Sequence, residues 1–251
     1  NADDFQKYLK VNKFNGEIVN VEHHMSHIAS SYYNSSFNSA VGLTIDGFGD
    51  FSSSQTYICK DNNINNIKKV FFPHSLGILY QSITQFLGFK NYGDEYKVMG
   101  LASYGEPNYM DQFEKLVKYD KKNLFNLNLD YFSHHTNSKF TYNFHDGIPK
   151  FPNLYSKNIF KILGHDREPN TEIEKKHFDI ACSLQKTFEN ILFNILNDLY
   201  EENKIDNLCL AGGCALNSKF NGLIKQKTSF KNIFIQPNAG DAGGSMGSAL
   251  Y

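Results

Sequence analysis

Three apolar segments of the chain each lead into a glycine-rich turn, and this repeated pattern constrains the fold more than any other feature. The segments are residues 40–46 (AVGLTID) before GFG, 207–211 (NLCLA) before GG, and 232–236 (NIFIQ) before PNAGDAGG. Short apolar runs bounded by glycine are typical of buried strands. Because helical spacing follows the second and third turns, at 214–225 and from Gly243, the pattern predicts an alternating α/β protein.

The remaining segments predict how this core is completed. Apolar stretches at 55–60 and 67–72 follow the first strand after short turns, so we expect a three-stranded antiparallel meander. Residues 17–22 (EIVNVE) are predicted to form a further strand, which leads into a helix through 29–33. Helical spacing also marks 75–87 and 172–203. Residues 104–170 have little periodicity and predict an insertion with short elements.

Composition narrows the class of protein. The chain has 251 residues, 41% of them hydrophobic, which is enough for one substantial core or two joined lobes. Its formal net charge of −1 suggests no general attraction to nucleic acid or to anionic lipid. No apolar run of about 18 residues appears, so we expect no membrane contact. The four cysteines form no Cys-x-x-Cys pair, and we expect reduced thiols in a cytoplasmic protein.

Two histidines and two aspartates form a candidate metal site. His23 and His27 are four residues apart, so in a helix both imidazoles would lie on one face. Asp46 ends an apolar strand, and Asp241 follows another one in the PNAGDAGG turn. Together they would make a set of two nitrogen and two oxygen ligands, suited to Fe(II), Zn(II) or Mn(II), of which we expect Fe(II) first. Taken singly, the histidines could be core or surface residues, and Asp46 could belong to an ordinary turn.

The glycine turns are candidate nucleotide-binding segments. Gly47 and Gly49 could expose backbone N–H groups to phosphate beside Asp46. Gly212 and Gly213 lie between a strand and a helix, where the lack of side chains leaves a flat backbone surface for a purine. A single Gly-Gly pair is weak support, and it gains weight only together with the other segments.

Seven segments, spread over nearly the whole chain, resemble the carbamoyltransferase family that includes nodulation-factor and antibiotic O-carbamoyltransferases. They are VEHHMSHIASSYY, TIDGFGD, FPHSLGILYQSITQFLGF, GDEYKVMGLASYG, FDIACSLQKTFE, LAGGCALNSKFNG and QPNAGDAGGSMGSALY, in the order of the family.

The resemblance implies an actin/Hsp70/sugar-kinase-like fold of two ribonuclease-H-like lobes, incomplete here at the N-terminus. Residues 1–38 would be the tail of the first lobe, and 39–251 the second, nucleotide-binding lobe with its insertion around 104–170. The C-terminal domain of the family would be absent, so we expect the chain to be a fragment with poor activity by itself. The resemblance also implies that His23, His27, Asp46 and Asp241 bind the metal, and that Gly47, Gly49, Lys97, Gly212, Gly213 and Asn217 border the nucleotide.

The activity implied by the resemblance is ATP-dependent O-carbamoyl transfer. Carbamoyl phosphate and ATP would give carbamoyl adenylate, whose carbonyl carbon an acceptor hydroxyl would attack. The acceptor could be a sugar, an antibiotic or a glycan, and the catalytic base and the oligomeric state stay open. Alternatives are a sister transferase of the same fold, of the hydrogenase-maturation or tRNA threonylcarbamoyl type, or a non-catalytic nucleotide-binding regulator.

Overall fold

The computed structural model describes residues 2–136, 143–145 and 148–251. Its main sheet consists of β1 (Ser39–Gly49), β2 (Ser52–Lys60), β3 (Asn63–Phe71), β8 (Asn207–Ala211) and β9 (Asn232–Ile235). The strand order is β3-β2-β1-β8-β9. β1 pairs antiparallel with β2, and β2 with β3, whereas β8 runs parallel to both β1 and β9. The predicted meander is therefore confirmed, and the sheet is mixed.

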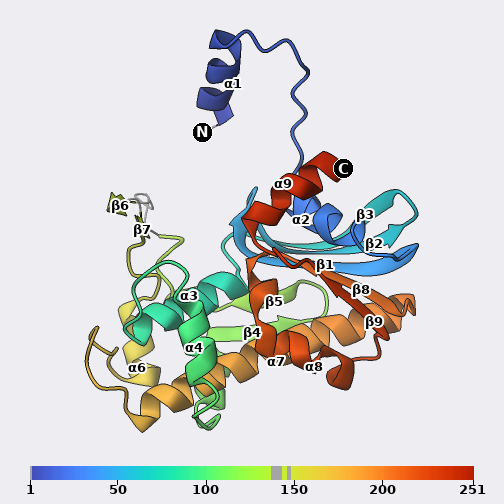
Figure 1. The fold of residues 1–251 in the computed structure, drawn as a ribbon. Helices are drawn as coiled ribbons and strands as arrows, with labels where there is room; N and C mark the ends of the chain where they lie inside the picture. The colour runs from blue at the N-terminus through green and yellow to red at the C-terminus, as the bar shows by residue number, and fades with distance from the viewer. Residues whose placement is uncertain (1, 137–142, 146–147) are drawn as a thin grey trace.

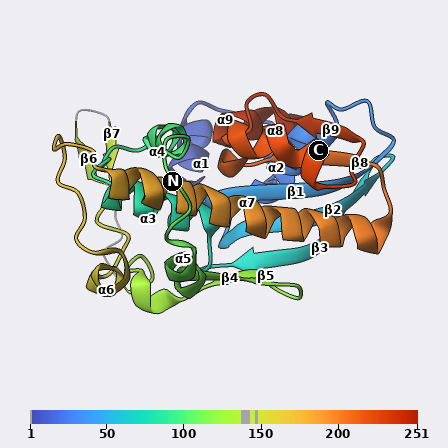
Figure 2. The same ribbon diagram turned by 90° about the horizontal axis from the view of Figure 1, so that it is seen from below.

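Helices cover both faces of this sheet (Figure 1). On one face lie α2 (His23–Tyr32) and α9 (Asp241–Leu250), and on the other lie α3 (Leu76–Phe86) and α7 (Lys175–Asn203). α7 runs along the sheet as the longest helix, as Figure 2 shows from below. β1 occupies the middle of the sheet, and its residues 40–45 are all buried. A strand covered on both faces has no polar side to show, which explains its continuous apolar run.

The smaller elements complete the described chain. They are α1 (Ala2–Val11), α4 (Glu95–Leu101), α5 (Met110–Leu116), α6 (Phe160–Leu163), α8 (Ser218–Lys227), the hairpin β4 (Val117–Asp120) and β5 (Leu124–Leu127), the pair β6 (Asn143–His145) and β7 (Ile148–Lys150), and the short 3-10 helices η1 (Leu129–Tyr131), η2 (Lys157–Ile159) and η3 (Gly213–Leu216). Most of the region 104–170 consists of such short pieces, as expected. Residues 137–142 and 146–147 of that region lie outside the described residues.

The strand predicted at 17–22 is wrong. These residues are extended but pair with no strand in the described chain, and they link α1, which stands away from the body, to α2 (Figure 1). Ile18 and Val19 are exposed, with 42% and 72% of their surface accessible. Alternating apolar residues favour a strand only where a neighbouring strand supplies the hydrogen bonds, and here the neighbour is missing.

Within the described chain, no helix combines the length and apolar character needed to cross a membrane.

Candidate metal centre and adjoining cavity

The two histidines project from the first turns of α2. Their spacing of four residues places both imidazoles on one face of the helix. The N-terminus of α2 is held by two carboxylates: Glu22 accepts a hydrogen bond from Met25 N at 2.6 Å, and Asp50 accepts one from His23 N at 2.8 Å. These bonds satisfy N–H groups that lack partners at a helix start, and they fix the direction in which His23 enters the site.

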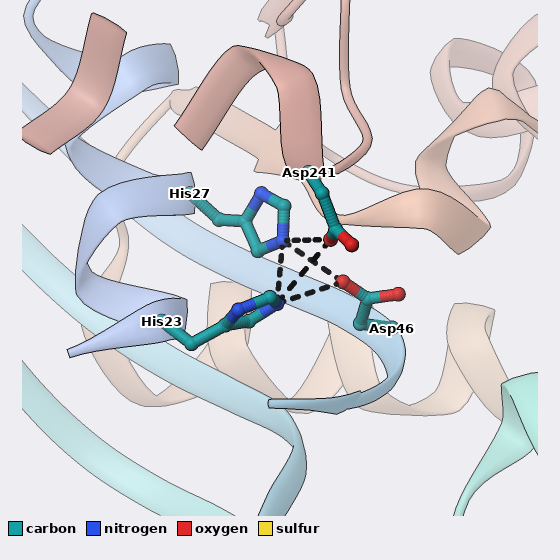
Figure 3. A group of neighbouring side chains, drawn as sticks. All are labelled: His23, His27, Asp46 and Asp241. Atoms are coloured by element: carbon teal, nitrogen blue, oxygen red, sulfur yellow. Dashed lines mark hydrogen bonds and ion pairs between the residues drawn. The ribbon is translucent and has the colours of Figure 1, made fainter. Parts of the chain in front are cut away.

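The two aspartates reach the same point from the ends of strands. Asp46 follows the buried part of β1, and Asp241 is the first residue of α9, after β9. One oxygen of Asp46 lies 3.1 Å from His23 Nε2 and 2.8 Å from His27 Nε2. Asp241 Oδ1 lies 3.5 and 3.6 Å from the same two nitrogens. All four ligand atoms lie within 4.8 Å of one another, converging as Figure 3 shows.

The arrangement of these atoms fits a divalent cation. The Nε2 atoms of His23 and His27 face each other at 3.0 Å, and both also face carboxylate oxygens. A set of two imidazole nitrogens and two carboxylate oxygens suits Fe(II), Zn(II) or Mn(II). His27 is 1% exposed, whereas Asp241 is 72% exposed, so the site opens to solvent on one side. The four residues predicted as metal ligands are thus brought together.

Neighbouring side chains in the cluster shift the pKa values of His27 and Asp46. Burial alone would lower the pKa of His27, but the nearby carboxylates of Asp241 and Asp46 outweigh it and raise the pKa to about 9. Burial would raise the pKa of Asp46, yet its hydrogen bonds to His23 and His27 lower it well below its usual range. A cation bound by this cluster would compete with the proton that the raised pKa favours on His27.

Glycines let the surrounding elements approach the ligands. A Cβ on Gly247 of α9 would lie 1.7 Å from the carbonyl oxygen of Ser26 in α2, so the two helices can touch only at a glycine. A Cβ on Gly49 would lie 2.0 Å from the ring of His23. Gly49, which was predicted to border the nucleotide, thus lies against His23 and is not among the residues that line the larger cavity.

A cavity of about 360 Å³ adjoins the metal centre. Asp46 lines it, together with Gly47, Gly213 and Asn217 from the predicted nucleotide set. Gly212 is not among the lining residues; its φ is 94°, and a Cβ there would lie 2.3 Å from the carbonyl oxygen of Ile45. A glycine at position 212 therefore allows the turn to pack closely against β1.

Lys97 does not line this cavity. Its Nζ lies 2.7 Å from Asp94 Oδ1, and the same segment contributes Glu95 and Tyr96 to the lining instead. Burial, followed by the nearby charge of Asp94, raises the pKa of the Glu95 carboxyl. Residues two apart on a helix face different ways, so helical spacing could have indicated that only one of Glu95 and Lys97 would face a ligand.

Most of the cavity wall escaped the sequence analysis. Its further residues include Tyr80 and Gln81 of α3, Met99 of α4, Phe188 of α7, Cys214 and Leu216. Apolar residues at helical spacing predict a buried face, and nothing in the spacing separates a residue that packs in the core from one that borders a cavity.

A second, open groove of about 300 Å³ lies on the other side of the ligand cluster. His23, His27 and Asp241 line it, together with Ser26, Asp50, Val21, Gly244 and Ser248. The four ligands therefore lie between two spaces, with Asp46 facing the cavity and the other three facing the groove. A metal ion bound there could be reached from both.

Fold and site define an α/β protein in which a cluster of two histidines and two aspartates that could hold a metal ion, near the end of the central strand, adjoins a cavity lined in part by glycines. The chain belongs to the carbamoyltransferase N-terminus family, which it matches over residues 5–250. An uncharacterized protein of Synechocystis sp. is 40% identical over 230 residues, which are 91% of this chain and 35% of that protein. Nodulation protein NolNO of Sinorhizobium fredii is 33% identical over 231 residues, 92% of this chain and 30% of that protein.

The chain thus spans about a third of the length of these relatives. Among solved structures, HypF of T. kodakarensis superimposes with a TM-score of 0.49 at 13% sequence identity, covering 98% of this chain and 38% of that one.

Proposed function

We propose that this chain is the metal- and nucleotide-binding part of an ATP-dependent O-carbamoyltransferase. It would convert carbamoyl phosphate, ATP and water to carbamoyl adenylate, phosphate and pyrophosphate, and then pass the carbamoyl group to an acceptor hydroxyl of a sugar, an antibiotic or a glycan with release of AMP. Family membership supports carbamoyl transfer. The observation that carries the proposal is that Asp46 belongs both to the metal-ligand cluster and to the wall of the cavity.

The finer fold assignment is also a proposal. We infer an actin/Hsp70/sugar-kinase-like architecture in which residues 39–251 form the nucleotide-binding lobe. The order β3-β2-β1-β8-β9 supports it, because an antiparallel meander continued by parallel strands is the arrangement expected of a ribonuclease-H-like lobe.

The four free cysteines agree with a reducing compartment, and we propose that the protein works in the cytoplasm.

In the proposed reaction the residues of this chain hold the substrates rather than react with them. The backbones of Gly47 and Gly213 line the cavity without side chains, so phosphate groups can approach them closely. Asp46 accepts the Gly47 N–H through Oδ1 at 2.7 Å and turns Oδ2 toward the histidines, which fixes both oxygens before a ligand arrives. His23, His27, Asp46 and Asp241 would bind the divalent cation, which would supply a Lewis acid and a template for the phosphate groups. The groove on the far side offers the acceptor hydroxyl a separate approach to the same centre.

The experiment that tests the proposal measures metal content and ATP binding for the wild-type chain and for His27→Ala. We expect about one metal ion per wild-type chain and almost none in the variant, because a buried ligand of the set is lost. His165→Ala, at an exposed position away from the cluster, is the matched control and should keep both ligands. A wild-type chain that binds neither metal nor ATP after reconstitution would contradict the assignment of the site.

A further inference from the structure

A buried amide network lies behind one wall of the cavity. Gln185 of α7 is 1% exposed and is not among the residues that line the cavity. Its Oε1 accepts hydrogen bonds from Tyr80 Oη at 2.8 Å and from Asn217 Nδ2 at 2.9 Å. Its Nε2 donates to Asn217 Oδ1 at 3.0 Å and to Glu189 Oε1 at 2.9 Å. All four hydrogen-bonding positions of this amide are therefore used.

Glu189 determines which way round the Gln185 amide is held. It is 3% exposed, and its carboxyl oxygen faces the amide nitrogen of Gln185. If the amide were turned over, two oxygens would face each other in buried surroundings, and neither would have a donor. The nitrogen of Gln185 must therefore point to Glu189, and its oxygen to Tyr80 and Asn217.

The orientation of the Asn217 side-chain amide is also fixed, because two separate groups donate hydrogen bonds to its oxygen. Its Oδ1 accepts from Gln185 Nε2 and also from the backbone N–H of Phe220, at 2.9 Å, which caps α8. Both acceptor positions of the oxygen are thus filled. One N–H of Asn217 Nδ2 donates to Gln185 Oε1, and the side chain also lies within hydrogen-bonding reach of the Tyr80 phenol, which lines the cavity together with Asn217. Toward the cavity this side chain can only donate.

We propose that Gln185 is a positioning residue that holds Asn217 with its N–H toward the cavity, so that the ligand group bound there must be a hydrogen-bond acceptor. The inference rests on the proposed function in taking that ligand to be a nucleotide. A nucleotide offers acceptors in its ring nitrogens, its ribose oxygens and its phosphate oxygens. The buried Glu189 then contributes to nucleotide binding without being one of the residues that line the cavity.

The first test is Asn217→Asp, with ATP as the probe. Aspartate has almost the same shape and caps a helix as well as asparagine does, but it has no N–H to give. We expect ATP affinity to fall about tenfold or more and the metal content to stay close to that of the wild type, whereas the melting temperature should fall, because the new oxygen faces Gln185 Oε1 in place of a donor. Unchanged ATP affinity in this variant overturns the inference.

The second test separates positioning from simple packing. Gln185→Glu sets a carboxylate against Glu189, and we expect ATP affinity to fall although residue 185 does not line the cavity. Exchanging both residues, Gln185→Glu with Glu189→Gln, restores a donor opposite an acceptor and should recover part of the affinity. Gln85→Glu is the matched control: Gln85 is 4% exposed and bonds to Pro152 and Leu154, away from the cavity. It should lower stability without changing ATP affinity.

The outcomes distinguish this inference from the proposed function. A wild-type chain that does not bind ATP overturns both together. A wild type that binds ATP, with Asn217→Asp binding equally well, overturns the positioning role alone. If Gln185→Glu does not fold, the Asn217→Asp variant still decides, because it keeps the cap of α8.

Discussion

Asp46 connects the metal centre to the cavity through its two oxygens. Oδ2 contacts both histidines, whereas Oδ1 accepts the Gly47 N–H and would lie 3.0 Å from a Cβ on Gly213. The carboxylate therefore has one orientation, fixed by the turn that follows it. A residue held in this way costs little to organise when a ligand binds, because its geometry is already set.

The histidines away from the metal centre have a different role, and His134 shows it. It is 5% exposed, donates from Nε2 to the carbonyl oxygen of Pro73 at 2.8 Å, and packs beside the rings of Phe48 and Phe72. Burial lowers the pKa of His134 from its ordinary value of 6.5, with smaller effects from Pro73, His135 and His74. The folded protein therefore keeps this imidazole neutral where the unfolded chain would protonate it.

This shift predicts a stability that depends on pH. Because the unfolded state binds more protons, the contribution of His134 is complete above pH 6.5 and is lost as the pH falls from 6.5 through the lowered pKa of the folded state. Urea unfolding at about pH 7.5 and about pH 5.5 measures the loss. His134→Gln can still donate to Pro73 but cannot titrate, so it should lose less stability on acidification than the wild type. Equal losses in both proteins would show that His134 does not contribute.

At the scale of elements, the contact between α2 and α9 sets the spacing of the four candidate ligands. His23 and His27 lie on α2, and Asp241 begins α9, so the distance between the helices determines whether the fourth ligand reaches the others. Gly247 is where this contact is closest. Ser26 of α2 and Ser248 of α9 also share a hydrogen bond of 2.9 Å beside it.

Gly247→Ala should therefore weaken metal binding without altering any ligand. The added methyl group cannot fit against the Ser26 carbonyl, so α9 must move and take Asp241 with it. We expect metal affinity to fall by about 10- to 100-fold, as for other changes outside the ligand set. Gly222→Ala in α8, where nothing lies within 4 Å of the new methyl, is the control and should keep wild-type affinity. A competition assay with a metal-binding dye compares the two, and equal affinities would show that α9 does not set the site.

A helix or strand can be predicted from the sequence when its buried side chains recur at a regular spacing. α7 was predicted from the helical spacing of its apolar residues, and the meander of β1 to β3 from apolar stretches joined by short turns. The segment 17–22 is a similar short stretch with apolar residues but has no partner strand in the described chain, and the sequence of a strand does not show whether its neighbour exists.

The same limit explains which parts of the candidate site could be predicted from the sequence. The convergence of His23, His27, Asp46 and Asp241 was predictable because helix spacing and the ends of strands place these residues in definite positions, whereas their binding of a metal stays a prediction. The cavity wall was not predictable, since Tyr80 and Phe188 are spaced like core residues. The network behind that wall depends on which amide atom faces which, and spacing in the sequence contains no such information.

At the scale of the whole molecule, the two spaces and the ligand cluster make one connected region. Asp46 lines the cavity, and the other three candidate ligands line the groove. Asp46 lies near the end of β1, the strand that contacts helices on both faces of the sheet. A cation bound by the cluster would neutralise the carboxylate of Asp46, which also lines the cavity where an anionic nucleotide would bind. A metal ion and a nucleotide should then bind with positive coupling, and by linkage the coupling must be reciprocal.

Thermal unfolding with metal alone, with ATP alone and with both measures this coupling. Each ligand at about 100 times its Kd should stabilise the chain by about 2.7 kcal/mol if the two act independently, and the pair should exceed the sum if they are coupled. Supplying ATP as its magnesium complex throughout, and removing the resident metal with a chelator beforehand, keeps metal chelation by free ATP out of the comparison. His27→Ala should keep the shift produced by ATP and lose the excess, because it removes a metal ligand that does not line the cavity. Strictly additive shifts in the wild type would mean that the shared Asp46 brings the two sites together in space without linking them in energy.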